Sequence, residues 1–195
     1  PEVGVITVEH YVYRPFHVVS PYFEHPPLLH LLVGAVGTLG GAVRWHNGRW
    51  VPLLPAPYQR HVVYDVVHDP DGNRWYGTNR GLLRESSGRW REFTVERDAL
   101  PATSVENLLY EDGRIWIGTG HGLATIDDER VRNLFGPTSG FADLGVSTMF
   151  AIDIPGRGRR VLLGGSSGPL LTDGRQIESL APACTPHGLI YDIQA

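Results

Sequence analysis

The chain is built from short runs of apolar or alternating residues, and clusters of turn-forming residues separate these runs. Alternation with a period of two is typical of strands, whereas amphipathic helices need apolar residues at steps of three and four. Four such runs follow one another at 62–67, 74–77, 82–85 and 90–94, and four more at 104–110, 114–118, 123–127 and 131–135. No helical pattern with capping residues occurs, so the sequence predicts an all-β protein.

The pattern also repeats. A core of the form Gly-Thr/Gly-x-x-Gly occurs four times at steps of 40, 41 and 46 residues, and its first glycines are Gly37, Gly77, Gly118 and Gly164. A second turn follows each core and ends in an arginine; these residues are Arg49, Arg89, Arg130 and Arg175. Further turn segments precede three of the cores, at 69–72, 111–113 and 155–158. Four antiparallel strands in each period are typical of propeller blades.

We therefore expect a β-propeller of four-stranded antiparallel blades. The expected blades are 28–57, 58–96, 97–136 and 137–181, with the first strand of a further blade at 182–195 and a lead-in or blade remnant at 1–27. The last assignment depends on the segment 187–195, which repeats the pattern of 61–67. These four to five blades are either a part of a larger ring or a small ring closed by pairing of the terminal strands. The chain opens at Pro1 and its single methionine is Met149, so we expect a mature or excised piece.

Two copies of the repeat carry a specific motif. The segments 71–82 and 112–123 closely resemble the two-component regulator propeller repeat, whose hallmark is D-G-x-x-W-x-G-T-x-x-G-L. The first unit lacks the Trp and the turn, and the last has Leu162 and Gly165 in place of Trp and Thr. The resemblance implies the extracytoplasmic sensor part of a bacterial histidine kinase or related regulator. It therefore implies a periplasmic or extracellular location, and ligand sensing or protein interaction in place of catalysis.

The fixed residues of the motif have structural interpretations. A large ring at the Trp position would fill the space between adjacent sheets and donate its N–H to a carbonyl. Glycine would allow a neighbouring sheet to approach, and threonine would hydrogen-bond a turn backbone. These residues are Trp75, Trp116, Gly77, Gly118, Thr78 and Thr119. The four repeated arginines are expected to be solvated or to cap backbone groups.

Residues that vary between the copies are the candidates for ligand contact. The loop between the second and third strands of a blade lies on the same face as the loop that leads into the next blade. The first loop carries Asn79, Arg80, His121, Ser166 and Ser167, and the second carries Arg97, Asp98, Thr138 and Ser139. Ordinary solvated loop residues are the alternative interpretation.

A second group of candidates lies on the first strands. Alignment of these strands places Asp65, Asn107, Met149 and Asp192 at one equivalent position near the central channel. A polar residue inside an apolar strand must be paired or hydrated. These residues therefore either hydrogen-bond neighbouring backbone or hold water or an ion in the channel.

Composition excludes several classes of function. The net charge is −4 and the acidic residues are scattered, so we expect no nucleic-acid partner. No apolar stretch is long enough for a membrane span. Cys184 is the single cysteine, and the nine histidines show no ligand spacing, so neither an internal disulfide nor a metal or other cofactor is expected.

The leading hypothesis is a non-catalytic sensor or recognition propeller that binds an unknown small molecule, saccharide or protein. Two alternatives remain open. One is a lyase similar to the streptogramin-inactivating propellers, which use a divalent metal at one channel mouth; His121 and Glu106 are the nearest candidates here. The other is a structural fragment that mediates protein interaction.

Overall fold

Three consecutive four-stranded sheets make up most of the described chain. The computed structural model describes residues 31–32, 43–46, 49–127, 129–136 and 145–180. Within these residues each sheet is an antiparallel meander in chain order. Blade I holds β4 (Val63–His68), β5 (Arg74–Thr78), β6 (Gly81–Ser86) and β7 (Arg89–Phe93); blade II holds β8 (Val105–Glu111), β9 (Arg114–Thr119), β10 (Gly122–Asp127) and β11 (Arg130–Phe135). Blade III holds β12 (Val146–Ile154), β13 (Gly158–Gly165), β14 (Leu170–Thr172) and β15 (Ile177–Ser179).

A smaller sheet precedes blade I. It has the strand order β1 (Leu31–Leu32), β2 (Val43–His46) and β3 (Arg49–Pro52), and a 3-10 turn, η1 (Ala56–Tyr58), follows it. Leu53, Leu54 and Tyr58 from the connection pack on the apolar face of blade I. The all-β prediction is confirmed, and the eight strands predicted for blades I and II lie within two residues of their observed bounds.

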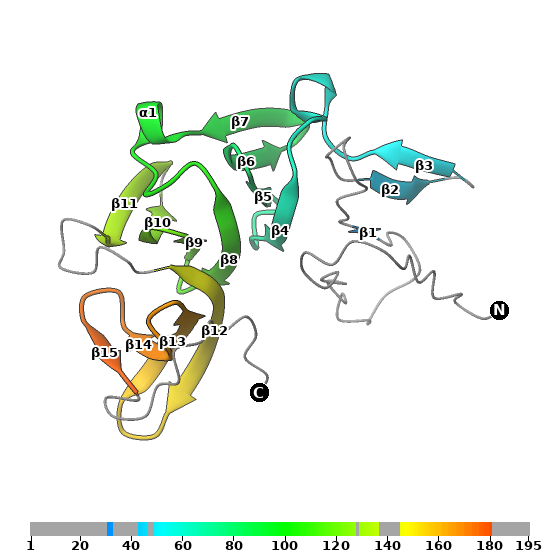
Figure 1. Cartoon of the computed structure of the whole chain (residues 1–195). Helices are drawn as coiled ribbons and strands as arrows, with labels where there is room; N and C mark the ends of the chain where they lie inside the picture. The colour runs from blue at the N-terminus through cyan, green and yellow to red at the C-terminus, as the bar shows by residue number, and fades with distance from the viewer. Residues whose placement is uncertain (1–30, 33–42, 47–48, 128, 137–144, 181–195) are drawn as a thin grey trace, which may run out of the picture.

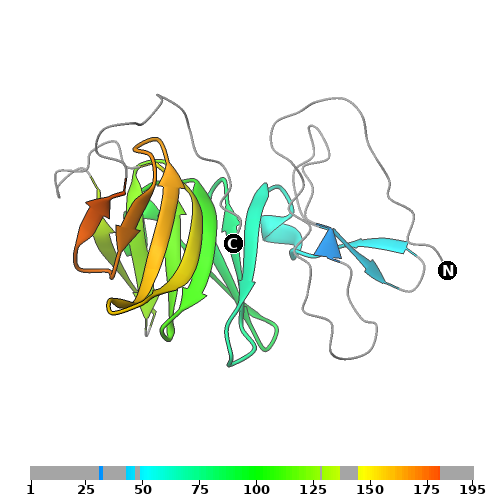
Figure 2. The same ribbon diagram turned by 90° about the horizontal axis from the view of Figure 1, so that it is seen from below.

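The blades are arranged with their first strands innermost. Strand β4 lies beside β8, and β8 lies beside β12, while β7, β11 and β15 are the outer strands (Figure 1). Seen from below, the sheets stand next to one another as separate layers (Figure 2). Apolar side chains fill the space between blades I and II and between blades II and III. This is the radial arrangement of a propeller, in which each blade buries its faces against its neighbours.

Each innermost strand carries a β-bulge near its start. The register shifts between Val63 and Asp65 in β4, between Val105 and Asn107 in β8, and between Val146 and Thr148 in β12. The bulges fix the equivalence of the three strands and place Thr148, which pairs with Gly164, at the position of Asp65 and Asn107. The sequence alignment that put Met149 there is wrong by one residue, because Met149 pairs with Leu163 and joins the core.

The fixed motif residues take the structural roles predicted for them. A Cβ atom on Gly77 would lie 2.8 Å from the Val105 carbonyl oxygen of blade II, and one on Gly118 would lie 2.9 Å from Val146 Cγ1 of blade III. Both glycines therefore permit the close approach of the next blade. The indoles of Trp75 and Trp116 lie in the corresponding interblade cores, and their detailed contacts differ.

The two indole N–H groups find different acceptors. Trp116 Nε1 donates to the Glu111 carbonyl oxygen at 3.4 Å, as expected. Trp75 Nε1 donates instead to Asp69 Oδ2 at 2.9 Å. Burial raises the pKa of Asp69, but the hydrogen bonds from Trp75 and Asn73 outweigh it and hold the pKa below its usual value.

One short helix was not expected from the sequence. Helix α1 (Val95–Asp98) is a single turn in the connection between blades I and II. Thr94 caps it by accepting a hydrogen bond from the Arg97 N–H, and Asp98 Oδ2 accepts one from the Thr94 N–H in return. The prediction of no capped helix is therefore wrong here, because four residues are too few to show a helical period. Within the described residues no helix has the length and apolar character needed to cross a membrane.

Candidate ligand-binding face

The turns between the second and third strands share one backbone design in blades I and II. Thr78 Oγ1 donates to the Gly81 carbonyl oxygen at 2.8 Å and accepts from the Arg80 N–H at 3.1 Å. Thr119 Oγ1 donates to the Gly122 carbonyl oxygen at 3.0 Å and accepts from the His121 N–H at 3.2 Å. Both threonines are fully buried. The predicted role of threonine in the turn is thus confirmed, and the residue at the tip of each turn is held by its backbone.

The tips of these turns present different side chains at one equivalent position. Arg80, His121 and Ser167 occupy it in blades I, II and III, and all three are exposed. In the described part of the chain none of these side chains takes part in a hydrogen bond or an ion pair. We call the end of the blades that carries these turns the recognition face. A cation, a titratable ring and a hydroxyl are therefore available there for contact with a partner.

The residues that precede these tips have a structural role in two blades. Asn79 Oδ1 accepts from the Val62 N–H at 2.9 Å, and the Asn79 N–H donates to the Val62 carbonyl oxygen at 3.0 Å. Ser166 makes the same pair with Gly145, at 3.0 Å through Oγ and 3.2 Å through its N–H. We call this pair of hydrogen bonds the turn clamp, because it ties the turn to the residue that precedes the innermost strand. The side-chain oxygens of these two predicted ligand residues are thus engaged within their own blades.

Blade II lacks the turn clamp. Gly120 stands where Asn79 and Ser166 stand, and Ser104 is the equivalent of Val62 and Gly145. Within the described residues, no hydrogen bond joins Gly120 to Ser104, and the Ser104 N–H has no acceptor. A Cβ atom on Gly120 would lie 3.8 Å from Glu106 Oε1, in ordinary contact.

A buried histidine that the sequence did not single out lies behind the turn of blade I. His61 is 4% exposed, its Nδ1 lies 3.3 Å from Thr78 Oγ1, and its Nε2 lies 4.0 Å from Glu92 Oε1. Burial lowers the pKa of His61 below its usual value; Glu92 opposes this shift and Arg80 adds to it. The one sequence signal was its position two residues before the innermost strand.

The loop that leads into the next blade carries the second group of predicted ligand residues, and the two that the structure describes make local contacts. Arg97 Nη2 donates to the Glu92 carbonyl oxygen at 3.0 Å and to Glu92 Oε2 at 3.1 Å, and Asp98 caps α1. Thr138 and Ser139 lie outside the described residues.

The polar residues of the innermost strands connect neighbouring blades. Asp65 Oδ1 accepts from the Val66 N–H at 2.8 Å, and Asp65 Oδ2 accepts from the Leu108 N–H at 2.7 Å. Asn107 Nδ2 donates to the same Oδ2 at 3.2 Å, whereas Asn107 Oδ1 is buried without a hydrogen-bond partner in the described part. Of the two interpretations left open by the sequence, the structure shows hydrogen bonding to neighbouring backbone at Asp65. Asp192 lies outside the described residues.

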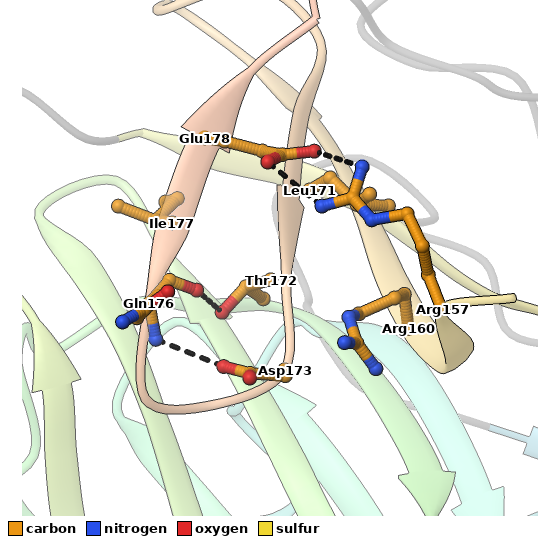
Figure 3. A pocket seen from close by; sticks show the side chains of 8 residues that line it. All are labelled: Arg157, Arg160, Leu171, Thr172, Asp173, Gln176, Ile177 and Glu178. Carbon is orange, nitrogen blue, oxygen red and sulfur yellow. Dashed lines mark hydrogen bonds and ion pairs between the residues drawn. The ribbon is translucent and has the colours of Figure 1, made fainter. Parts of the chain in front are cut away.

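The opposite end of the blades carries the repeated arginines and a pocket. Arg89, Arg130 and Arg175 are exposed at the turns before the outer strands. A pocket of about 90 Å³ lies on blade III at this end, where Arg157 binds both oxygens of Glu178 at 2.8 Å (Figure 3). Arg160, Thr172 and Asp173 also line it. Its arginine and carboxylate groups are largely neutralised by one another, and it lies far along the strands from the recognition face.

The metal-dependent alternative has no donor set in the described residues. Within them, no group of three or more His, Cys, Asp or Glu side chains is placed to hold a metal ion. His121 is exposed at its turn, and Glu106 is the bulged residue of β8. The described residues therefore do not include the donor set that a metal-dependent lyase would need.

Comparison with solved structures identifies the architecture. The extracellular domain of BT3049 from B. thetaiotaomicron, described as a hybrid two component system, aligns with 77% of this chain at a TM-score of 0.57 and 17% identity. The extracellular domain of BT4673 from the same organism, described as a one component system, aligns with 77% of it at 0.59 and 19%. The chain has a β-propeller fold. At these identities the likeness establishes the fold of the propeller and no more.

The propeller spans about one fifth of these two structures, 21% of the first and 20% of the second. No family model matches the chain. No curated protein matches it either.

Proposed function

We propose that this chain is a non-catalytic recognition propeller and forms the ligand-sensing part of an extracytoplasmic signal-transduction protein. The observation that carries the proposal is the contrast at the recognition face. Buried threonines hold the backbone of the turns in blades I and II, while the residue at the exposed tip differs between the blades: Arg80, His121 and, in blade III, Ser167. A rigid scaffold that presents variable side chains is the usual arrangement of a binding surface.

The extracellular domains with the same fold support the sensor role and the location. Both are extracellular domains, one of a protein described as a hybrid two component system and one of a protein described as a one component system. The fold similarity by itself leaves function open, so the proposal depends on the tips of the turns.

The side chains at the tips favour a ligand that carries an anionic group. The guanidinium of Arg80 offers a planar donor fork for a carboxylate or phosphate, and the His121 ring can donate a further hydrogen bond. We therefore expect an anionic or sugar-like ligand at this face.

D-Glucuronate, a sugar that carries a carboxylate, is a suitable probe. Binding followed by ¹H–¹⁵N NMR should weaken by about 1.5–3 kcal/mol in Arg80→Ala, the range for a hydrogen bond to a charged partner. Arg89→Ala at the opposite end is the matched control and should leave binding unchanged. Equal losses from both substitutions, or a loss from Arg89→Ala alone, would refute this placement of the site.

A further inference from the structure

His61 places a titratable ring directly behind a turn of the recognition face. Its side chain is 5% exposed, and its Nδ1 lies 3.3 Å from Thr78 Oγ1, which accepts the Arg80 N–H at 3.1 Å. One threonine hydroxyl therefore joins the ring to the backbone that holds the exposed Arg80 side chain. A change in the charge of the ring acts close to the site proposed for an anionic group.

The hydrogen bonds of Thr78 decide which nitrogen of the neutral ring carries the hydrogen. A threonine hydroxyl has one hydrogen, and Thr78 donates it to the Gly81 carbonyl oxygen at 2.8 Å. Thr78 Oγ1 can then only accept from the ring, so Nδ1 of His61 is the donor. In the neutral ring the other nitrogen, Nε2, carries a lone pair.

This second nitrogen faces a carboxylate. His61 Nε2 lies 4.0 Å from Glu92 Oε1, and the other oxygen of Glu92 accepts from Arg97 Nη2 at 3.1 Å. While Nε2 carries a lone pair, no hydrogen lies between the ring and the carboxylate. A proton added to Nε2 creates an ion pair with Glu92 and leaves the Nδ1–H bond to Thr78 in place. The ring can therefore become charged without losing its position.

The other groups around the ring act on the same equilibrium. Tyr58 of η1 meets the ring edge-on, with the centroids 5.4 Å apart, and burial lowers the pKa of His61. The charge of Arg80 lowers this pKa further, whereas Glu92 raises it. An anion bound to Arg80 would offset the repulsion between Arg80 and the imidazolium. Proton uptake by His61 and anion binding at Arg80 therefore favour each other.

We propose that His61 makes the recognition face respond to pH: Nε2 takes up a proton in acid, the imidazolium pairs with Glu92, and an anionic group then binds more tightly at Arg80. The inference rests on the proposed function, because it adds regulation to the same anion site. A unit charge behind the turn, screened by water, should raise the affinity by about two- to five-fold. By linkage, a saturating anion should raise the midpoint of the His61 titration by the same factor, about 0.3–0.7 pH units.

The first experiment examines the ring without a ligand, in the ¹⁵N-labelled 195-residue chain. Long-range ¹H–¹⁵N correlation spectra distinguish a ring nitrogen that carries a hydrogen from one that carries a lone pair. In the neutral ring of His61, Nδ1 should carry the hydrogen. Glu92→Gln removes the partner of the imidazolium and should move the midpoint of the titration to lower pH, whereas Glu96→Gln, on the exposed side of α1, should leave it in place.

Two results of this experiment would overturn the proposal. One is a hydrogen on Nε2 of the neutral ring, since His61 would then already donate towards Glu92. The other is a midpoint that Glu92→Gln does not move.

The second experiment measures the affinity for D-glucuronate above and below that midpoint. His121 is exposed on the same face and also titrates, so both proteins compared carry His121→Gln. In His121→Gln the affinity should rise about two- to five-fold as the pH falls through the His61 midpoint, and addition of His61→Gln should remove this rise. The carboxylate of glucuronate stays ionised as long as the pH is held above about 5. An equal rise in the two proteins would contradict the proposal.

The design separates this inference from the proposed function. If glucuronate binding depends on Arg80 but shows the same pH dependence with and without His61, the regulation is wrong and the anion site stands. If glucuronate binding is indifferent to Arg80→Ala, the anion site is wrong and the effect of His61 on binding is refuted with it. The pairing of His61 with Glu92 is judged separately, by the titration without a ligand.

Discussion

The Asp65 carboxylate provides the sharpest test of how the blades are held together. It accepts the backbone N–H of Val66 in its own blade and of Leu108 in the next blade, at 2.8 and 2.7 Å. Val66 and Leu108 are equivalent residues of adjacent innermost strands. Replacing Asp65 by alanine removes both hydrogen bonds and also the contact with Asn107 Nδ2.

The expected loss of stability follows from these contacts. An N–H group deprived of its acceptor in the interior costs about 1–3 kcal/mol. Asp65 is half-buried, so water can compensate in part, and we take the lower half of that range for each group. Asp65→Ala should therefore lower the free energy of unfolding by about 2–4 kcal/mol. Asp65→Asn keeps one acceptor oxygen and should cost about half as much.

Urea unfolding at 25 °C measures this difference, with the slope of the transition unchanged. Thr148→Ala is the matched control, because Thr148 occupies the equivalent position in blade III and its side chain makes no hydrogen bond within the described part of the chain. It should change the free energy of unfolding by less than about 0.5 kcal/mol. A loss in Asp65→Ala no larger than the loss in Thr148→Ala would refute the role assigned to the carboxylate.

Three further measurements test other parts of the structure. Because burial lowers the pKa of His61, the unfolded chain binds a proton at this residue more readily than the folded chain does. The free energy of unfolding should therefore be highest above about pH 6.5 and should fall as the pH drops through the lower pKa of the folded state. Urea unfolding at a series of pH values measures this dependence, and His61→Gln should flatten it. Gly118→Ala should cost about 1–3 kcal/mol in thermal unfolding, because its methyl group would lie 2.9 Å from Val146 Cγ1; an unchanged midpoint would show that the blades can move apart freely. Arg159→Ala removes the exposed pair with Glu111 between blades II and III and should cost less than about 1 kcal/mol, an effect that added salt should abolish.

The repeat made the fold predictable from the sequence. The alternating runs predicted the strands, and the Gly-Thr/Gly-x-x-Gly cores predicted the turns. Each residue type in these cores meets a need of the local backbone. Thr78 and Thr119 satisfy their turn backbones, and Gly77 and Gly118 accept the next blade. Such constraints act on one position at a time, so they can be recognised in a single copy.

The phase of the innermost strand was harder to predict. Alignment of the first strands by sequence led to Met149, because the bulges that set the register leave no mark in composition. The inserted residues are Tyr64, Glu106 and Ser147, which share no property. In the structure, the residue after each bulge pairs with a glycine of the second strand, and this pairing shows which residues are equivalent. Such a pairing involves two strands, so the sequence of one strand does not reveal it.

The turn clamps escaped sequence reasoning for a similar reason. Asn79 and Ser166 differ in size and chemistry, and their partners lie 17 and 21 residues away. As single residues they resembled the variable polar groups of a binding loop. Their role becomes visible once the backbone brings the turn to the start of the innermost strand.

Comparison between blades separates residues that stabilise the propeller from residues that are free to recognise a ligand. Where a side chain satisfies a backbone group, as Thr78 and Asn79 do, its replacement leaves that group without its partner, so stability restricts the residue. At the tip of the turn the backbone is already held by threonine in two blades, so Arg80 and His121 carry no such cost and can vary.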